Sequence, residues 1–276
     1  MTFSVRSASI RFGDVIALDD VSVDVETGSV VVVVGGDGAG KTTLLRALVG
    51  ELVLEHGVVA APSPERNGYL TASAGSWPSL TVRQNMDFVG GIYGLEGDRL
   101  EQRRESLLAR AGLTDAGDRL ASQLSGGMRR KLGFIMAMQH EPDLLVLDEP
   151  TTGVDPVSRI DLWRLVSEAA VAGAAVLMST TYLDEAERAG SLLVLDGGRT
   201  LAEGSLDQVR AALVGSITEA DRPHRSAWSW RRGRRFHEWW PSGELLPDDV
   251  VAIDPDLEDV VVALSLQRRH EIGVPR

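Results

Sequence analysis

Apolar and polar positions follow two different patterns along the chain, and together they predict a mixed α/β fold. Residues 21–25 (VSVDV) alternate apolar and polar side chains, as expected for a strand with one exposed face. Short, continuously apolar runs are typical of strands buried on both faces of a parallel sheet. Such runs occupy residues 30–34, 144–147, 174–178 and 192–195. Because helix-like segments separate these runs, we expect a largely parallel sheet covered by helices.

Two further regions depart from this alternation. Between residues 75 and 140, charges and leucines recur at helical spacing, as in DRLEQRRESLLARAGL, which predicts a helical insertion.

A break in composition follows Gly215. Residues 222–240 hold six arginines and four of the six tryptophans, and residues 244–259 hold seven acidic residues and no basic one. The last segment, 256–269, opens with acids and ends with arginines, as a helix dipole favours. We therefore expect one domain over residues 1–214 and a C-terminal extension over 215–276, made of a Trp/Arg-rich linker and a terminal helix.

Composition, charge and the length of apolar runs exclude several classes of protein and of site. The 276 residues carry a formal net charge of −12 and include no cysteine, which excludes disulfides, thiolate metal sites and cysteine nucleophiles. The longest apolar run, residues 169–178, is half of the ~20 residues that span a membrane, and the N-terminus lacks the apolar stretch of a secretory signal. The acidity argues against nucleic-acid binding through a broad basic face. We expect a cytosolic protein whose membrane contact comes through a partner.

A phosphate-binding loop is the strongest chemical signal. The pattern G-x-x-x-x-G-K-[ST] lies between a buried strand and a helix-forming segment, in Gly35, Gly36, Asp37, Gly38, Ala39, Gly40, Lys41 and Thr42. Glycines let successive backbone N–H groups face a phosphate chain at the positive end of the next helix. Lys41 supplies a charge for the β- and γ-phosphates, and Thr42 a hydroxyl for Mg²⁺. The alternative is a glycine-rich turn that fits the pattern by chance.

Two weaker motifs accompany the loop. The strand-like LLVL is followed by Asp148 and Glu149, which predicts a metal-side carboxylate and a carboxylate directed at the attacking water. Ser125, Gly126 and Gly127 open a helix and offer a hydroxyl and bare N–H groups to an anion. The alternative for Ser125 is an ordinary helix N-cap with nothing bound.

In this order, GGDGAGKTT, LSGGM, LLVLDEPT and TTGVDP resemble the nucleotide-binding subunit of ATP-binding-cassette (ABC) transporters over residues 3–214. The resemblance implies a P-loop NTPase (RecA-like) α/β core with an antiparallel β region, and ATP with Mg²⁺ as ligands. It places Phe12 against adenine and Thr43 in the phosphate site, with Lys41 and Glu149 as catalytic residues and Thr42 and Asp148 on the metal. The alternative for Phe12 is an ordinary strand residue. It also implies a dimer of two ATP-binding subunits, in which Ser125, Gly126 and Gly127 of one chain meet the nucleotide of the other and Asp155 lies at the interface.

The terminal DLEDVVVALSLQRR and the signature LSGGMRRKL are similar to those of the daunorubicin-resistance-like, ABC-2 class of bacterial exporter ATPases. This implies a separate transmembrane permease subunit and a peripheral position on the cytoplasmic face of the membrane. Soluble ABC ATPases of DNA repair or translation carry a long coiled-coil insertion or two cassettes, for which this sequence has no room. Trp77 and Leu80 lie in the loop that, by analogy, neighbours the permease groove. Alternatively, they pack within the helical insertion.

The sequence departs from the family at three positions. Ala72 stands where the family has a glutamine that contacts Mg²⁺ and water, and Thr181 replaces a histidine that bonds the γ-phosphate. Asp37 replaces an asparagine. Because phosphoryl transfer depends on positioned charge and hydrogen bonds, we predict normal MgATP binding and slow hydrolysis. Two alternatives remain: Glu149 suffices while the Thr181 hydroxyl partly substitutes, or the chain is a non-hydrolysing regulatory subunit that pairs with an active cassette.

Residues 222–240 allow three interpretations. Arginines interleaved with tryptophans can stack on single-stranded bases, or contact anionic lipid headgroups. The third interpretation, which we favour, is a partly ordered linker that folds against the acidic stretch following it. We therefore expect no nucleic-acid partner.

Overall fold

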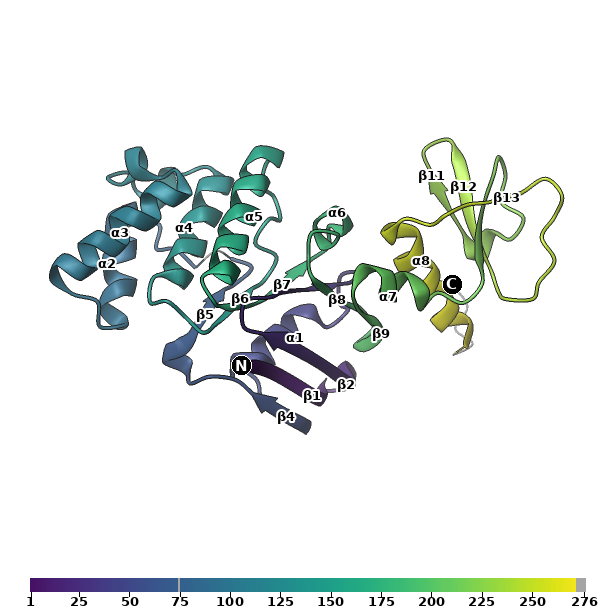
Figure 1. The fold of residues 1–276 in the computed structure, drawn as a ribbon, viewed down its shortest axis with the longest axis horizontal. Helices are drawn as coiled ribbons and strands as arrows, with labels where there is room; N and C mark the ends of the chain where they lie inside the picture. The colour runs from purple at the N-terminus through teal and green to yellow at the C-terminus, as the bar shows by residue number, and fades with distance from the viewer. Residues whose placement is uncertain (74, 272–276) are drawn as a thin grey trace.

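The computed structural model describes residues 1–73 and 75–271, and at its centre lies a six-stranded sheet (Figure 1). The strand order is β5-β6-β7-β3-β8-β9, and all neighbours are parallel except the antiparallel pair β8–β9. The strands are β3 (Val30–Val34), β5 (Asn67–Leu70), β6 (Leu144–Leu147), β7 (Ala175–Thr180), β8 (Ser191–Asp196) and β9 (Arg199–Gly204). The four apolar runs in the sequence form β3, β6, β7 and β8, which confirms the predicted α/β fold with a largely parallel sheet.

A smaller antiparallel sheet with strand order β2-β1-β4 covers one side of the central sheet. Its strands are β1 (Thr2–Phe12), β2 (Val15–Glu26) and β4 (His56–Ala60). Helix α1 (Lys41–Leu48) contacts β1, β2 and β4 as well as β7, so it lies between the two sheets. The apolar side chains that alternate along β1 and β2 join those of α1, β3 and β6 in one buried cluster.

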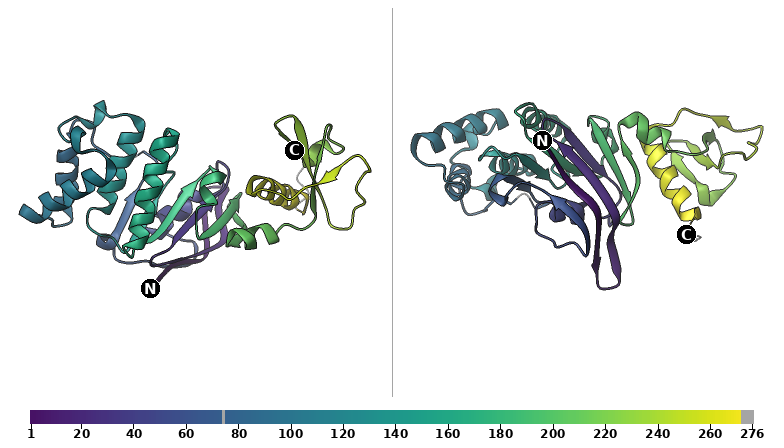
Figure 2. Two further views of the ribbon diagram at one scale, coloured as in Figure 1. Left: turned by 45° about the horizontal axis from the view of Figure 1, so that its top comes forward. Right: turned by 60° about the horizontal axis from the view of Figure 1, so that its bottom comes forward.

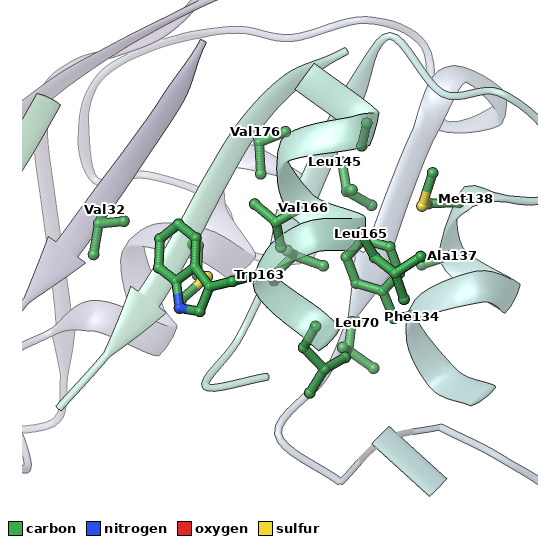
Figure 3. Packing of buried hydrophobic residues seen from close by; sticks show 14 of the residues in the cluster. Val32, Leu70, Phe134, Ala137, Met138, Leu145, Trp163, Leu165, Val166 and Val176 are labelled. Carbon is green, nitrogen blue, oxygen red and sulfur yellow. The ribbon is translucent and has the colours of Figure 1, made fainter. Parts of the chain in front are cut away.

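Helices cover the other side of the central sheet and extend from it as the predicted insertion (Figure 1). They are α2 (Val82–Ile92), α3 (Gly97–Ala111), α4 (Gly126–Met138), α5 (Pro156–Val171) and the short α6 (Leu183–Ala186). Side chains from α4 and α5 pack on those of β3, β5, β6 and β7 (Figure 3). The labelled members of this core are Val32, Leu70, Phe134, Ala137, Met138, Leu145, Trp163, Leu165, Val166 and Val176. This core holds the carboxyl ends of β3, β6 and β7 in a fixed arrangement.

After α7 (Leu206–Ala211) the chain forms a third sheet, with strand order β11-β12-β10-β13 (Figure 1). Its strands are β10 (Ser216–Ala220), β11 (Ser229–Arg232), β12 (Arg235–Trp240) and β13 (Val251–Ala252). Helix α8 (Leu257–Glu271) follows and lies between this sheet and the pair α7 and β9, as the views of Figure 2 also show.

The structure differs here from the expected linker, because most of residues 222–240 lie in a β-hairpin. The expected pairing of its arginines with acidic residues is present. Arg232 binds Asp256 and Glu258, and Arg225 binds Glu244. The predicted terminal helix is also present, as α8. Among the described residues, no helix is both long and apolar enough to cross a membrane.

Candidate functional site

The glycine-rich loop connects the end of β3 at Val34 to the start of α1 at Lys41, and its path leaves no room for side chains at two positions. A Cβ on Gly35 would lie 2.3 Å from the backbone oxygen of Leu195, at the end of β8. A Cβ on Gly40 would lie 2.6 Å from the backbone oxygen of Ala17, and its φ of 103° belongs to the left-handed region. Glycine is required at both positions, because the loop is wedged between β2 and the β8–β9 turn.

Lys41 is buried and directs its ammonium group back into the loop. Its Nζ donates hydrogen bonds to the backbone oxygens of Gly35 (2.8 Å) and Gly36 (3.1 Å). It also lies 3.4 Å from the carboxylate oxygen Oε1 of Glu149. A charge held this way, next to exposed backbone N–H groups, is the arrangement that binds a polyphosphate.

Asp148 lies at the carboxyl edge of the central sheet and is hydrogen-bonded to two hydroxyl groups. Its Oδ1 accepts hydrogen bonds from the hydroxyls of Thr42 (3.2 Å) and Ser179 (2.7 Å). Its other oxygen, Oδ2, is buried and has no hydrogen-bond partner among the described residues. A buried carboxylate oxygen without a partner is costly unless a cation or donor binds there.

This geometry fits Mg²⁺. The available ligands are the Asp148 carboxylate and the Thr42 hydroxyl, both oxygen donors, as this hard cation prefers. No group of three or more His, Asp or Glu side chains that could hold a metal exists in the part of the chain that is described. Mg²⁺ is usually held by one or two carboxylates together with water and the phosphates of the substrate.

Glu149 follows Asp148 in a strained backbone conformation. Its φ of 47° is in the left-handed region, which non-glycine residues rarely adopt. The strained residue is held by two hydrogen bonds: its N–H donates to Ser179 Oγ (2.9 Å), and its Oε2 accepts from Thr152 Oγ1 (3.1 Å). Such strain clusters at functional sites. Here it turns the side chain towards Lys41.

A second buried carboxylate, Glu185 of α6, was not predicted from the sequence. Its Oε2 accepts hydrogen bonds from Thr151 Oγ1 (2.7 Å) and Thr180 Oγ1 (2.9 Å), and its Oε1 lies 3.4 Å from Arg159 Nε. Thr151 follows Glu149 closely in the chain, and Thr180 ends β7. Glu185 therefore ties the segment after Glu149 to the end of β7.

Both carboxylates after β6 act on ionisable groups nearby. Burial, assisted by the charge of Asp148, raises the pKa of Tyr69 to about 12. Burial also lowers the pKa of Arg130, and the charges of Glu149 and Asp148 oppose that change. In both cases burial is the main cause, and the charges after β6 make a smaller contribution.

An open pocket of about 330 Å³ lies over the loop. It is lined by Val15, Ile16, Ala17, Asp37, Gly38, Ala39, Gly40, Lys41, Thr42, Thr43 and Glu149. The pocket thus joins the predicted phosphate residues to an apolar strip on β2. Phe12, at the end of β1, is 51% exposed and pairs with Val15 across the β1–β2 hairpin, but it is not among the lining residues.

The predicted residues of the LSGGM segment lie outside this pocket. Ser125 is exposed and caps α4 by accepting a hydrogen bond from Met128 N–H (3.2 Å), as in the alternative interpretation. Gly126 is exposed and Gly127 is buried beside Ser158 and Asp155. Asp155 caps α5, and the hydrogen bonds it accepts there lower its pKa.

All three positions that depart from the family pattern, Asp37, Ala72 and Thr181, are exposed. Ala72 lies in an exposed turn after β5, and its methyl group offers no hydrogen bond. Thr181 is exposed directly after β7, whereas the preceding Ser179 and Thr180 are buried and bind Asp148 and Glu185.

Comparisons with known proteins agree with this geometry. Residues 18–152 match the family described as "ABC transporter". The chain is 38% identical over 223 residues to the daunorubicin resistance ATP-binding protein DrrA3 of Streptomyces coeruleorubidus, which covers 77% of this chain and 71% of that protein. It is 36% identical over 218 residues to the probable multidrug ABC transporter ATP-binding protein YbhF of Escherichia coli, covering 75% of this chain but 38% of that protein.

Among solved structures, an ATP-binding subunit of an ABC transporter superposes with a TM-score of 0.70 at 27% identity, covering 76% of this chain and 92% of that one. The fold, the phosphate loop and the similarity in sequence coincide over the same residues. The chain is therefore an ATP-binding subunit of the ABC transporter family.

Proposed function

We propose that this subunit binds MgATP at residues 35–42 and couples its turnover to export of a solute through a separate membrane subunit. The single observation that carries the proposal is the meeting of Lys41, Thr42, Asp148 and Glu149 at one edge of the sheet. The similarity to a daunorubicin resistance protein supports export as the direction of transport. A position on the cytoplasmic face of the membrane follows from the same proposal.

In the proposed site, different residues bind the phosphates, the metal ion, the attacking water and the adenine. The Lys41 ammonium is held by two loop carbonyls and lies near Glu149. A triphosphate would take over these contacts and accept hydrogen bonds from the loop N–H groups. Asp148 and Thr42 would hold Mg²⁺, which neutralises charge developing on the phosphates. Glu149 would orient and deprotonate the attacking water, and the exposed Phe12 would cover the adenine.

Hydrolysis at this site is proposed to be slow. Neither the Ala72 methyl group nor the exposed Thr181 reproduces the contacts that glutamine and histidine make in the family. Losing one preorganised donor typically lowers the rate by about 10²–10³. When two donors act together, losing both lowers the rate by less than the product of the two single losses. Binding does not depend on either position, so it is expected to survive.

A second ATP-binding subunit completes the proposed assembly. Ser125 and Gly126 are exposed and lie outside the pocket above their own loop, so their proposed nucleotide contact requires another chain. A permease surface is proposed at the helical insertion, where the exposed large apolar side chains include Trp77 (40%), Phe88 (49%) and Ile92 (64%), while Leu80 is half-buried. The rings of Trp77 and Phe88 pack edge to face, with 4.6 Å between their centroids. No nucleic-acid partner is proposed.

Two assays on the purified subunit test this function. Binding of a fluorescent ATP analogue with Mg²⁺ should saturate in the wild type and disappear in Lys41→Ala. Steady-state ATPase activity should be low and should rise about tenfold or more in Thr181→His, and further with Ala72→Gln. Thr181→Ala is the matched control, because its rate falls only if the threonine hydroxyl already contributes. A wild-type rate of about one per second, unchanged in Thr181→His, contradicts a weakened site.

The same assays address the alternative of a regulatory subunit that never turns over. This alternative is favoured by the intact Ser125–Gly127 segment, of which Ser125 and Gly126 are exposed and available to a more active partner cassette. Saturable MgATP binding with no turnover, even in the variant carrying both Thr181→His and Ala72→Gln, would support it.

A further inference from the structure

The turn between β8 and β9, residues Asp196–Gly198, is packed against the phosphate loop on one side. The N–H of Gly198 donates a hydrogen bond to the backbone oxygen of Ala39 (3.1 Å), inside the loop. At the other end of the loop, the Cα of Gly35 approaches the backbone oxygen of Leu195 so closely that no Cβ would fit. The position of the loop therefore depends on the position of this turn.

The opposite side of the same turn contacts helix α8. Arg268, near the end of α8, donates a hydrogen bond from Nη1 to the backbone oxygen of Asp196. Its guanidinium also lies 3.6 Å from the place where a Cβ of Gly197 would be. One half-buried side chain thus reaches from the C-terminal extension to the turn that supports the phosphate loop.

Helix α8 is itself fixed by two hydrophobic clusters. Leu257, Val260 and Leu264 belong to the core of the central sheet, whereas Ala263 and Leu266 belong to the cluster of the C-terminal sheet. A shift of the C-terminal sheet would therefore move α8 and, with it, Arg268. Packed elements of this kind transmit displacements because protein cores resist compression.

We propose that Arg268 is a positioning residue for the phosphate loop and that it couples the C-terminal extension to nucleotide binding. The proposal rests on the proposed nucleotide site at residues 35–42. Coupling between two sites is reciprocal, so docking of α8 favours nucleotide binding to the same extent that the nucleotide favours docking of α8. A partner that binds the C-terminal sheet would thereby change the affinity for MgATP.

Three variants of the full chain test this coupling. Arg268→Ala removes the hydrogen bond to Asp196, and Arg268→Lys keeps a charge and one donor. Arg269→Ala is the matched control, since Arg269 is exposed and its side chain makes no hydrogen bond or ion pair with the described residues. The Kd of a fluorescent ATP analogue with Mg²⁺ should rise about fivefold in Arg268→Ala, less in Arg268→Lys, and not at all in Arg269→Ala.

A second readout separates positioning from a general loss of stability. In the nucleotide-free protein, amide hydrogen exchange of residues 35–41 should become faster in Arg268→Ala, while exchange of the β6 and β7 amides stays unchanged. In the wild type, MgATP should slow the exchange of residues 257–270. Uniformly faster exchange in Arg268→Ala, or an unchanged Kd together with unchanged loop exchange, would overturn the inference. A wild-type chain that shows no saturable binding would refute the proposed nucleotide site, while loop exchange in the nucleotide-free variants would still test Arg268.

Discussion

The buried carboxylate of Glu185 offers a sharp test of how the site is held together. Arg159 pairs with two carboxylates that are adjacent in the chain, Glu185 (3.4 Å) and Asp184 (3.2 Å). The side chain of Glu185 is 1% exposed, whereas that of Asp184 is 62% exposed. Glu185 also accepts hydrogen bonds from the buried hydroxyls of Thr151 and Thr180, whereas Asp184 accepts one from Arg159 Nη2. The two acids therefore share one cation but differ in burial and in hydrogen bonding.

These differences set the expected magnitudes. Glu185→Ala leaves two buried hydroxyls without their acceptor and removes the buried partner of Arg159, which should destabilise the fold by about 3–5 kcal/mol. Glu185→Gln keeps an oxygen for both hydroxyls and removes the charge, so about 1–2 kcal/mol is expected. Asp184→Ala breaks a solvent-exposed ion pair, for which about 0–1 kcal/mol is typical.

Urea-induced unfolding of the four proteins, followed by far-UV circular dichroism, measures these differences as shifts in midpoint at a common slope. The midpoint should fall in the order wild type, Asp184→Ala, Glu185→Gln, Glu185→Ala. If the two alanine variants unfold at the same midpoint, the stability comes from the ion pair with Arg159 and the buried hydrogen bonds add nothing. An equal loss in Glu185→Gln and Glu185→Ala would instead show that the charge alone matters.

Further substitutions test the loop and a half-buried histidine, His140. Gly35→Ala should lower the free energy of unfolding by about 1–3 kcal/mol, seen as a lower thermal midpoint, because its Cβ meets the backbone oxygen of Leu195 at 2.3 Å. Gly36→Ala, with open space around the added Cβ, should leave the thermal midpoint unchanged. Burial lowers the pKa of His140 in the folded chain below its ordinary value of 6.5. As the pH is lowered through 6.5, the unfolded chain therefore takes up a proton that the folded chain does not, and the free energy of unfolding decreases. His140→Phe loses the hydrogen bond to the backbone oxygen of Asn67, but its thermal midpoint should change less between pH 7 and pH 5 than that of the wild type. If the thermal midpoints of wild type and variant change with pH to the same extent, His140 is not the source of the pH dependence.

The central strands could be predicted because their burial is uniform. Residues 30–34 are apolar throughout, and β3 has the same bounds. The prediction for β7 ended at Met178, whereas the strand continues through Ser179 and Thr180. Both residues are completely buried, although they are polar. They are tolerated there because Asp148 and Glu185 accept their hydrogen bonds, and a hydrophobic pattern along the chain does not contain that information.

The C-terminal sheet shows the same limit more strongly. Strand β12 has the sequence RFHEWW, in which His237 and Glu238 are consecutive and both are buried. Alternation of apolar and polar residues therefore fails to mark a strand. The compensating partners come from other elements: His237 lies 2.7 Å from Asp259 of α8, and Glu238 binds Arg225. A segment whose buried charges are neutralised by distant residues has the composition of a solvated linker.

The same reasoning explains which residues at this edge of the sheet the local sequence marks and which it does not. Lys41, Thr42, Asp148 and Glu149 stand in contiguous motifs, so the local sequence identifies them. Ser179 belongs to no such motif, yet it binds both Asp148 and the N–H of Glu149. Strand β7 lies between β3 and β6, and Leu147 pairs with Met178, so the next residues along the two strands, Asp148 and Ser179, must be neighbours. Parallel strands bring their carboxyl ends to one edge of the sheet. A polar residue at the end of a strand that lies between two strands carrying motif residues is therefore placed next to those residues. Applied to the sequence, this rule selects Ser179 once the order of the strands is known.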